Sequence, residues 1–144
     1  MPKRTIADMT GRELVKKLDA EFSLYVRLKE ADDCGYVTCP TCGVTHPYNS
    51  GDIHCSHFYG RANHNVRWDE RNVIAQCARE NIWDEGNKPE MAEVLLKKWG
   101  AKELAQMRAL SKMPNKRPDD EWLRMMIAEY RSKIKALREE KGLK

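Results

Sequence analysis

The sequence predicts an α+β fold that is mostly helical, with helices flanking a central third of short strands. Apolar residues recur every three or four positions over 10–31 and over 122–137, as in amphipathic helices. Between 32 and about 72 this period vanishes, and Gly, Pro, Asn, Cys and His dominate. We therefore expect one compact domain, 1-144, whose central third is pinned by a metal rather than by a large core.

The composition is that of a globular protein with a large wet surface. The chain has 26 Lys plus Arg against 22 Asp plus Glu, a net charge of +4, with 33% charged and 41% hydrophobic residues. This balance excludes wholesale disorder and a multidomain machine. No window approaches the roughly 20 apolar residues of a membrane span, and the first residues lack the apolar run of a signal peptide. We expect a cytosolic protein.

The leading helix, 10–31, carries one apolar stripe. Thr10 and Glu13 form a capping-box pattern at its start. The stripe consists of Leu14, Leu18, Phe22, Tyr25 and Leu28.

The central third contains most of the cysteines. Their number in the chain, five, is odd, which argues against a disulfide framework and favours a metal. Cys39 and Cys42 form a CxxC turn between two short predicted strands, 36–38 and 44–48. A redox function would need a helix that starts at the motif, so a zinc knuckle is favoured.

The C-terminal region, 88–144, is predicted to be helical and basic. One helix opens at Asn87 and runs to Trp99, a short one follows through 104–110, and a long one ends at Gly142. Residues 112–144 hold ten basic against six acidic side chains, either as a solvated helix face or as a phosphate-contacting surface. The apolar stripe of the last helix either packs on the leading helix or forms a dimer interface.

Residues 52–58 place two histidines, a cysteine and an aspartate close together, and a block with Asn72 and Cys77 follows at 67–77. With the knuckle and Asn81, these motifs resemble the phage recombination endonucleases of the NinG type, also called Rap, within the HNH or ββα-metal nuclease superfamily. The resemblance spans roughly residues 20 to 140.

The resemblance implies a ββα-metal core over 32–87, a β-hairpin followed by a helix and braced by a structural zinc. It implies a metal-dependent, structure-selective endodeoxyribonuclease that cuts branched DNA, including Holliday junctions and D-loops. Such a protein is encoded by a phage or prophage and acts in the cytoplasm of the bacterial host. Because branched DNA has near two-fold symmetry, a homodimer would suit it.

The resemblance also implies roles for individual residues. His57 ends the first strand as the general base, and Asn72 anchors the loop between the second strand and the helix. Asn81 is an oxygen ligand of the catalytic Mg²⁺ or Mn²⁺, with Asp52 or His54 as further ligands. The residues expected to contact DNA phosphates are Arg61 and Arg67 near the site and Arg131, Lys135 and Arg138 on the last helix.

Two departures from the family pattern matter. Glu80 stands where the second CxxC has cysteine, so the zinc ligands are Cys39, Cys42, Cys77 and a fourth group. Three alternatives are open: Glu80 ligates, Cys55 ligates, or the zinc is lost and Trp83 supplies bulk.

The second departure is His54, where relatives carry an aspartate; imidazole suits Mn²⁺ better than Mg²⁺, which leaves the metal open. An alternative function is a catalytically inactive zinc-knuckle DNA-binding accessory protein of recombination. A generic homing or restriction nuclease is less favoured, since 144 residues leave no room for a further sequence-reading domain.

Overall fold

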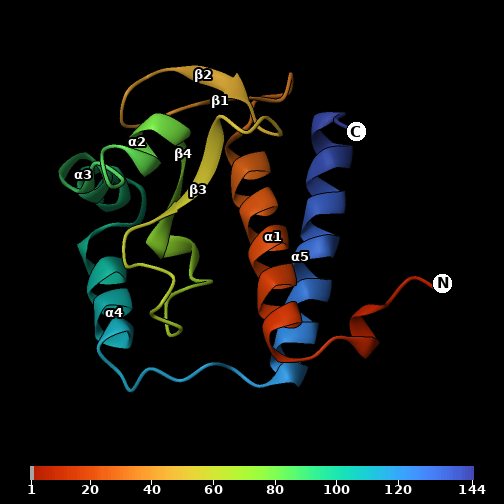
Figure 1. Cartoon of the computed structure of the whole chain (residues 1–144). Coiled ribbons are helices and arrows are strands. Elements are labelled where there is room, and N and C mark those ends of the chain that lie inside the picture. Colours follow the sequence, from red (N-terminus) through yellow and green to blue (C-terminus); the bar gives the residue numbers. More distant parts are fainter. Residues whose placement is uncertain (1) are drawn as a thin grey trace.

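The computed structural model describes residues 2–144 and has the predicted α+β architecture. About half of the chain is helical, and the described part contains two small antiparallel sheets (Figure 1). The helices are α1 (Gly11–Glu30), α2 (Ala78–Ile82), α3 (Lys88–Trp99), α4 (Ala101–Ser111) and α5 (Asp120–Lys141). The strands are β1 (Tyr36–Thr38), β2 (Thr45–Pro47), β3 (Ile53–His57) and β4 (Val73–Cys77), and short 3₁₀ helices are η1 (Ile6–Asp8) and η2 (Glu70–Asn72).

The two long helices, α1 and α5, lie side by side and build the larger part of the core (Figure 1). Leu14, Leu18 and Phe22 of α1 are almost completely buried, as the apolar stripe predicts. The face that α5 turns to them is centred on Leu123 and Ile127. Tyr130 and Ile134 of the predicted stripe therefore pack within the chain, whereas Met125 is 56% exposed and Leu123 and Ile127 take the central place. A dimer interface on α5 stays a prediction.

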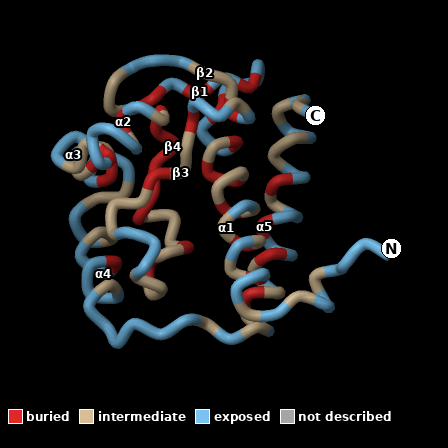
Figure 2. The backbone as a smooth tube through the Cα atoms, in the orientation of Figure 1, coloured by how far each residue is buried: buried red, intermediate tan, exposed pale blue. Residues whose placement is uncertain are grey.

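The second sheet, β3 and β4, lies between α1 and α3. Ile53 pairs with Cys77 and His57 with Val73 in an antiparallel register. All five residues of β4 are buried, because Val73 belongs to the core cluster that includes α1 while Ile74 packs with Met91 of α3. Figure 2 shows this strand as one of the most continuously buried segments. In the ββα unit formed by β3, β4 and α2, both faces of β4 are therefore covered.

The first sheet, β1 and β2, is the predicted knuckle. The turn between the strands is closed by hydrogen bonds from Cys39 N to the Val44 carbonyl, 2.7 Å, and from Gly43 N to the Cys39 carbonyl, 2.8 Å. Gly43 has a φ of +84°, which only glycine adopts without strain. The turn presents its two cysteines toward the end of β4.

The ends of the helices differ from the prediction at one point. The capping box of Thr10 and Glu13 does not form, because Glu13 pairs with Arg4 at 2.7 Å and the Thr10 side chain makes no capping bond. Gly142, with a φ of +67°, ends α5 as predicted. Within residues 2–144, no helix has both the length and the apolarity that crossing a membrane requires.

We predict that Leu18→Ala lowers the free energy of unfolding by about 2–5 kcal/mol, because Leu18 is fully buried between α1 and α5 and its truncation leaves a cavity. Leu96→Ala is the matched control, since Leu96 is 50% exposed, and should change stability by about 0.5 kcal/mol or less. Urea unfolding of both variants measures the difference, and equal stabilities would contradict the assigned core.

Candidate active site and metal centre

His57, the predicted general base, is the last residue of β3 and is largely buried. Its Nε2 atom lies 2.8 Å from the carbonyl oxygen of Arg67. A carbonyl only accepts hydrogen bonds, so Nε2 carries the proton and Nδ1 keeps a free lone pair. Burial lowers the pKa of His57 from its ordinary value, despite the Arg67 hydrogen bond that raises it. The imidazole is therefore neutral at pH 7 and able to accept a proton.

Asn72 is completely buried and fastens the loop that follows His57. Its Oδ1 accepts from Tyr59 N at 2.8 Å, and its Nδ2 donates to the carbonyls of Tyr59 and Val66 at 2.9 and 3.0 Å. This loop joins β3 to β4, whereas the sequence predicted an anchor between the second strand and the helix. Asn72, which directly precedes β4, therefore fixes the loop that follows His57.

The guanidinium group of Arg67 forms hydrogen bonds with other residues of the protein. Its Nε donates to Asp19 Oδ1 at 3.0 Å, its Nη2 pairs with Asp19 Oδ2, and its Nη1 donates to the carbonyl of Arg61 at 2.9 Å. Trp68 Nε1 donates to the same carboxylate at 3.0 Å. These bonds hold the loop against α1. A phosphate contact by Arg67, as expected from the sequence, would therefore compete with these hydrogen bonds for the same guanidinium group.

The residues proposed for the catalytic ion are only partly brought together. Asn81 Oδ1 accepts from Ser56 Oγ at 2.8 Å, and Asn81 Nδ2 donates to His54 Nδ1 at 3.0 Å. His54 Nε2 in turn lies 3.0 Å from the carbonyl of Gly51. Asp52 lies apart from this pair, with a side chain 65% exposed and 3.8 Å from His46 Nδ1.

His54, His57 and Asn81 line one cavity of about 560 Å³ between α1 and β3, which we call the His57 cavity. Asp19 supplies the only carboxylate among the described residues that line it, and Arg67 and Trp68 occupy that carboxylate. An amide oxygen beside an imidazole suits a transition ion such as Mn²⁺, but this donor set does not suit Mg²⁺, which prefers several oxygen ligands.

The sequence analysis missed the polar face of α1. Asp19, Ser23 and Arg27 recur every four residues and line the His57 cavity. Arg27 Nη1 donates to the Tyr48 carbonyl at 2.6 Å, and Arg27 Nε lies 3.2 Å from Ser23 Oγ. The i, i+4 spacing of polar residues beside the apolar stripe was the available signal. Arg61, which the sequence did indicate, is exposed at the same cavity.

Arg131, Lys135 and Arg138 of α5 do not line the His57 cavity. Arg131 Nε pairs with Glu21 of α1 at 3.2 Å, and Lys135 is exposed. A buried Nε of Arg138 has no hydrogen-bond partner among the described residues. Their contact with DNA stays a prediction.

Three cysteines converge where the knuckle meets the end of β4. The sulfur atoms of Cys39, Cys42 and Cys77 all lie within 4.8 Å of one another, with 3.5 Å between Cys42 and Cys77. Sulfurs on a tetrahedral zinc lie about 3.8 Å apart, given Zn–S bonds of about 2.3 Å, so the three atoms fit this ion. Three converging thiols favour a metal over a redox pair.

The hydrogen bonding of this cluster suits metal binding. Burial alone would raise the pKa of Cys39, but hydrogen bonds from the backbone of Cys77, Thr41 and Cys42 and from the Thr41 hydroxyl lower it to about 7. Burial raises the pKa of Cys77 to about 11, so this thiol needs the ion itself to lose its proton.

The candidates for the fourth zinc ligand are placed differently. The Glu80 carboxylate is not part of the cysteine cluster; it accepts from Asn87 Nδ2 at 3.3 Å, while the Glu80 backbone faces the Cys77 sulfur. Cys55 lines the His57 cavity instead, and burial raises its pKa to about 12. Trp83 is 80% exposed, so the idea that it fills space in place of a zinc is wrong.

We predict that Cys77→Ser destabilises the protein much more than Cys34→Ser, because Cys77 belongs to the cluster whereas Cys34 is exposed. Structural zinc contributes about 10–16 kcal/mol of apparent binding energy in small peptides, and a chelator should remove that contribution. Thermal unfolding before and after treatment with a chelator measures both effects. Identical melting of the two variants and the chelated wild type would contradict a zinc site.

The whole-chain comparison agrees with these motifs. The model of the family described as bacteriophage lambda NinG protein matches residues 3–140. No curated protein and no solved structure matches the chain. The matched range includes α1, all but the last residue of α5, the cysteine cluster and the His57 cavity. The chain therefore belongs to the NinG family.

Proposed function

We propose that this NinG-family protein is an endodeoxyribonuclease that hydrolyses a phosphodiester bond at branch points of recombining DNA, such as Holliday junctions and D-loops. One observation carries the proposal. The Nδ1 lone pair of His57 is left free because Arg67 accepts the proton of Nε2, and the ring lines a cavity that also contains two arginines, Arg27 and Arg61.

The reaction follows from these groups. His57 Nδ1 takes a proton from a water molecule, whose oxygen attacks the phosphorus while the bond from phosphorus to the 3′ oxygen breaks. Arg61 is exposed at the cavity and can neutralise a phosphate oxygen, where charge develops in the transition state. The leaving oxygen takes a proton from solvent.

A lysine keeps the end of β3 in position for this chemistry. Lys88 Nζ donates to the carbonyls of His57 and Phe58 at 2.6 and 2.9 Å. Together with Asn72, which fixes Tyr59 and Val66, it restrains the backbone on the C-terminal side of the base. Restrained positioning of the base is a large part of what a nuclease must supply.

Metal dependence is part of the proposal. Asn81 Oδ1 and His54 Nδ1 would hold a Mn²⁺-type ion in exchange for the hydrogen bonds that they now accept from Ser56 Oγ and Asn81 Nδ2, and the ion would supply charge stabilisation at the scissile phosphate. We therefore expect cleavage to be faster with Mn²⁺ than with Mg²⁺.

Selection of branched DNA would rest on shape and phosphate contacts. The chain is basic overall, with a net charge of +4, and α1 and the loop after β3 bring arginines to the cavity. Contacts of this kind position a protein on nucleic acid without reading its sequence.

We predict that His57→Ala slows nicking of a four-way junction by about 10²–10⁴-fold, because a general base is removed, while junction affinity stays nearly unchanged. His46→Ala is the control, since His46 lies outside the His57 cavity. Gel assays of nicking and binding with Mn²⁺ and with Mg²⁺ provide both numbers. Wild-type nicking by His57→Ala would remove this residue from the chemistry.

The pH dependence of nicking is a further prediction. A general base must be unprotonated, and burial lowers the pKa of His57 below its ordinary value of 6.5. The rate should therefore fall to half of its plateau value at a pH below 6.5. Single-turnover rates between about pH 5 and 8 test this, and a midpoint above 6.5 would contradict the assignment.

A DNA-binding accessory function is the second candidate. It is favoured by the lack of a free carboxylate in the described lining of the His57 cavity, since Asp19 is bound to Arg67 and Trp68. Junction binding without nicking in either metal would support it over the nuclease.

A further inference from the structure

The His57 cavity is the first of three neighbouring hollows on the surface. It shares Asp19 with a second hollow of about 520 Å³, which we call the basic hollow. The basic hollow shares His64 with a third of about 440 Å³, which we call the aromatic hollow. The three therefore form a row that leads away from His57 across α1 toward the start of α5.

The basic hollow suits phosphate groups. Its four cationic residues are Arg12, Lys16, Arg67 and Arg117. Arg12 and Lys16 lie one turn apart on α1, both are exposed, and neither forms an ion pair within the described residues. The one carboxylate of the hollow, Asp19, is neutralised by Arg67. A surplus of positive charge is therefore left facing solvent.

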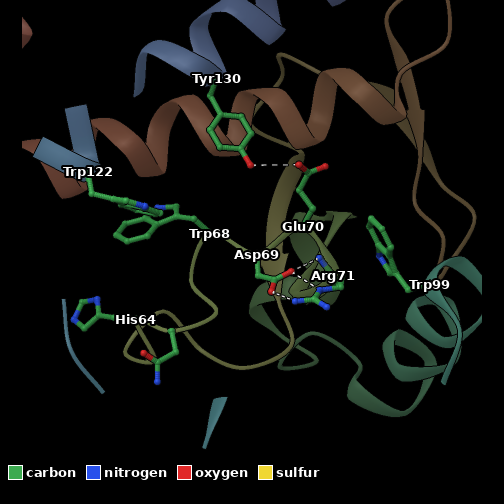
Figure 3. Close-up of a pocket in the computed structure, with 9 residues that line it drawn as sticks. His64, Trp68, Asp69, Glu70, Arg71, Trp99, Trp122 and Tyr130 are labelled. Atoms are coloured by element: carbon green, nitrogen blue, oxygen red, sulfur yellow. Dashed lines mark hydrogen bonds and ion pairs between the residues drawn. The ribbon is translucent and has the colours of Figure 1, made fainter. Parts of the chain in front are cut away.

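The aromatic hollow contains three of the four tryptophans of the chain. Trp68 and Trp122 form one wall, with ring centroids 5.9 Å apart and planes at 46°. Figure 3 shows Trp99 on the opposite side and Tyr130 at the top, with the ion pair of Asp69 and Arg71 between them. Its volume is in the range of pockets for small organic ligands, about 300–1,000 Å³.

Two polar atoms of the aromatic hollow lack partners. Trp99 Nε1 and His64 Nδ1 are buried without a hydrogen bond to any described residue. A buried polar group without a partner is unfavourable, and a ligand that offers hydrogen-bonding atoms could supply one.

The charges of the aromatic hollow argue against a cationic ligand. Asp69 pairs with Arg71 at 2.7 Å, and Glu70 lies 3.2 Å from Lys29 Nζ and 3.3 Å from the Tyr130 hydroxyl. Both carboxylates already have partners. A neutral aromatic ring that carries carbonyl and N–H groups fits better.

We propose that the aromatic hollow binds an unpaired nucleobase, and that the basic hollow binds the phosphates of the single strand that connects this base to the His57 cavity. Basic grooves combined with aromatic stacking surfaces are the general solution for binding single strands. The inference rests on the proposed function and refines its substrate, because it implies branched DNA with an unpaired segment beside the cut.

The test compares two dye-labelled oligomers of about ten nucleotides, within the usual site size, without added divalent metal. One is oligothymidylate, and the other is an abasic oligomer with the same sugar-phosphate backbone. Stacking of one base is worth a factor of about 5–150 in affinity, so fluorescence anisotropy should show wild-type protein binding oligothymidylate tighter by such a factor. Equal affinities would overturn the proposal.

Variants locate the binding site. Trp122→Ala should abolish the preference for oligothymidylate without changing the affinity for the abasic oligomer. Trp99→Phe keeps a ring in place and removes the unpartnered N–H, so it should reduce the preference about two- to tenfold even if Trp122→Ala fails to fold. Trp83→Ala, which removes a tryptophan outside the aromatic hollow, is the control and should change neither affinity.

The role of the basic hollow is tested by the salt dependence of binding. The double variant Arg12→Gln and Lys16→Gln should lower the affinity for both oligomers alike and make the slope of log affinity against log salt shallower by about one to two units.

If the preference for oligothymidylate survives in Trp122→Ala and Trp99→Phe, the base binds elsewhere and the proposal is wrong. Junction nicking without a base preference would overturn this inference alone, while a base preference without nicking would overturn only the nuclease.

Discussion

The ion pair between Asp19 of α1 and Arg67 of the loop between β3 and β4 is the contact on which the candidate site depends. The same carboxylate accepts from Trp68, and the backbone carbonyl of Arg67 accepts from His57. One carboxylate thus fixes the loop whose carbonyl sets the tautomer of His57. Because both side chains are mostly buried, loss of either partner would leave a charge without compensation.

The cysteine cluster acts on the other end of the ββα unit. Cys77 ends β4, and its register partner Ile53 begins β3 at the far end from His57. A metal there would fix β1 and β2 against β4 at a place where short strands bury little apolar area. The strand pair that carries His57 is consequently held by the Asp19–Arg67 contact at one end and by the cysteine cluster at the other.

Sequence patterns were sufficient for the parts of the fold that depend on local periodicity. The stripe through Leu14, Leu18 and Phe22 identified α1, and Gly142 marked the end of α5. The predicted capping box of Thr10 does not form because Glu13 pairs instead with Arg4, which lies outside the helix.

The candidate site was only partly predictable for a similar reason. His57 and the cysteines belong to compact motifs, which the resemblance to the NinG family already contained. The use of Arg67 by Asp19 joins residues 48 positions apart, and no local spacing encodes such a pairing. The same holds for the meeting of His64 and Trp122 at one hollow, which depends on how α5 docks.

The docking of α5 has a consequence for how the chain matures in the cell. Lys141 Nζ donates to the carbonyls of Leu28, Lys29 and Ala31, which closes the C-terminal end of α1 across more than a hundred residues of sequence. During synthesis α1 emerges first and cannot cover its apolar side until α5 has left the ribosome. Contacts of such long sequence separation form slowly, so the nascent chain exposes the apolar face of α1 until α5 has been synthesised and has docked.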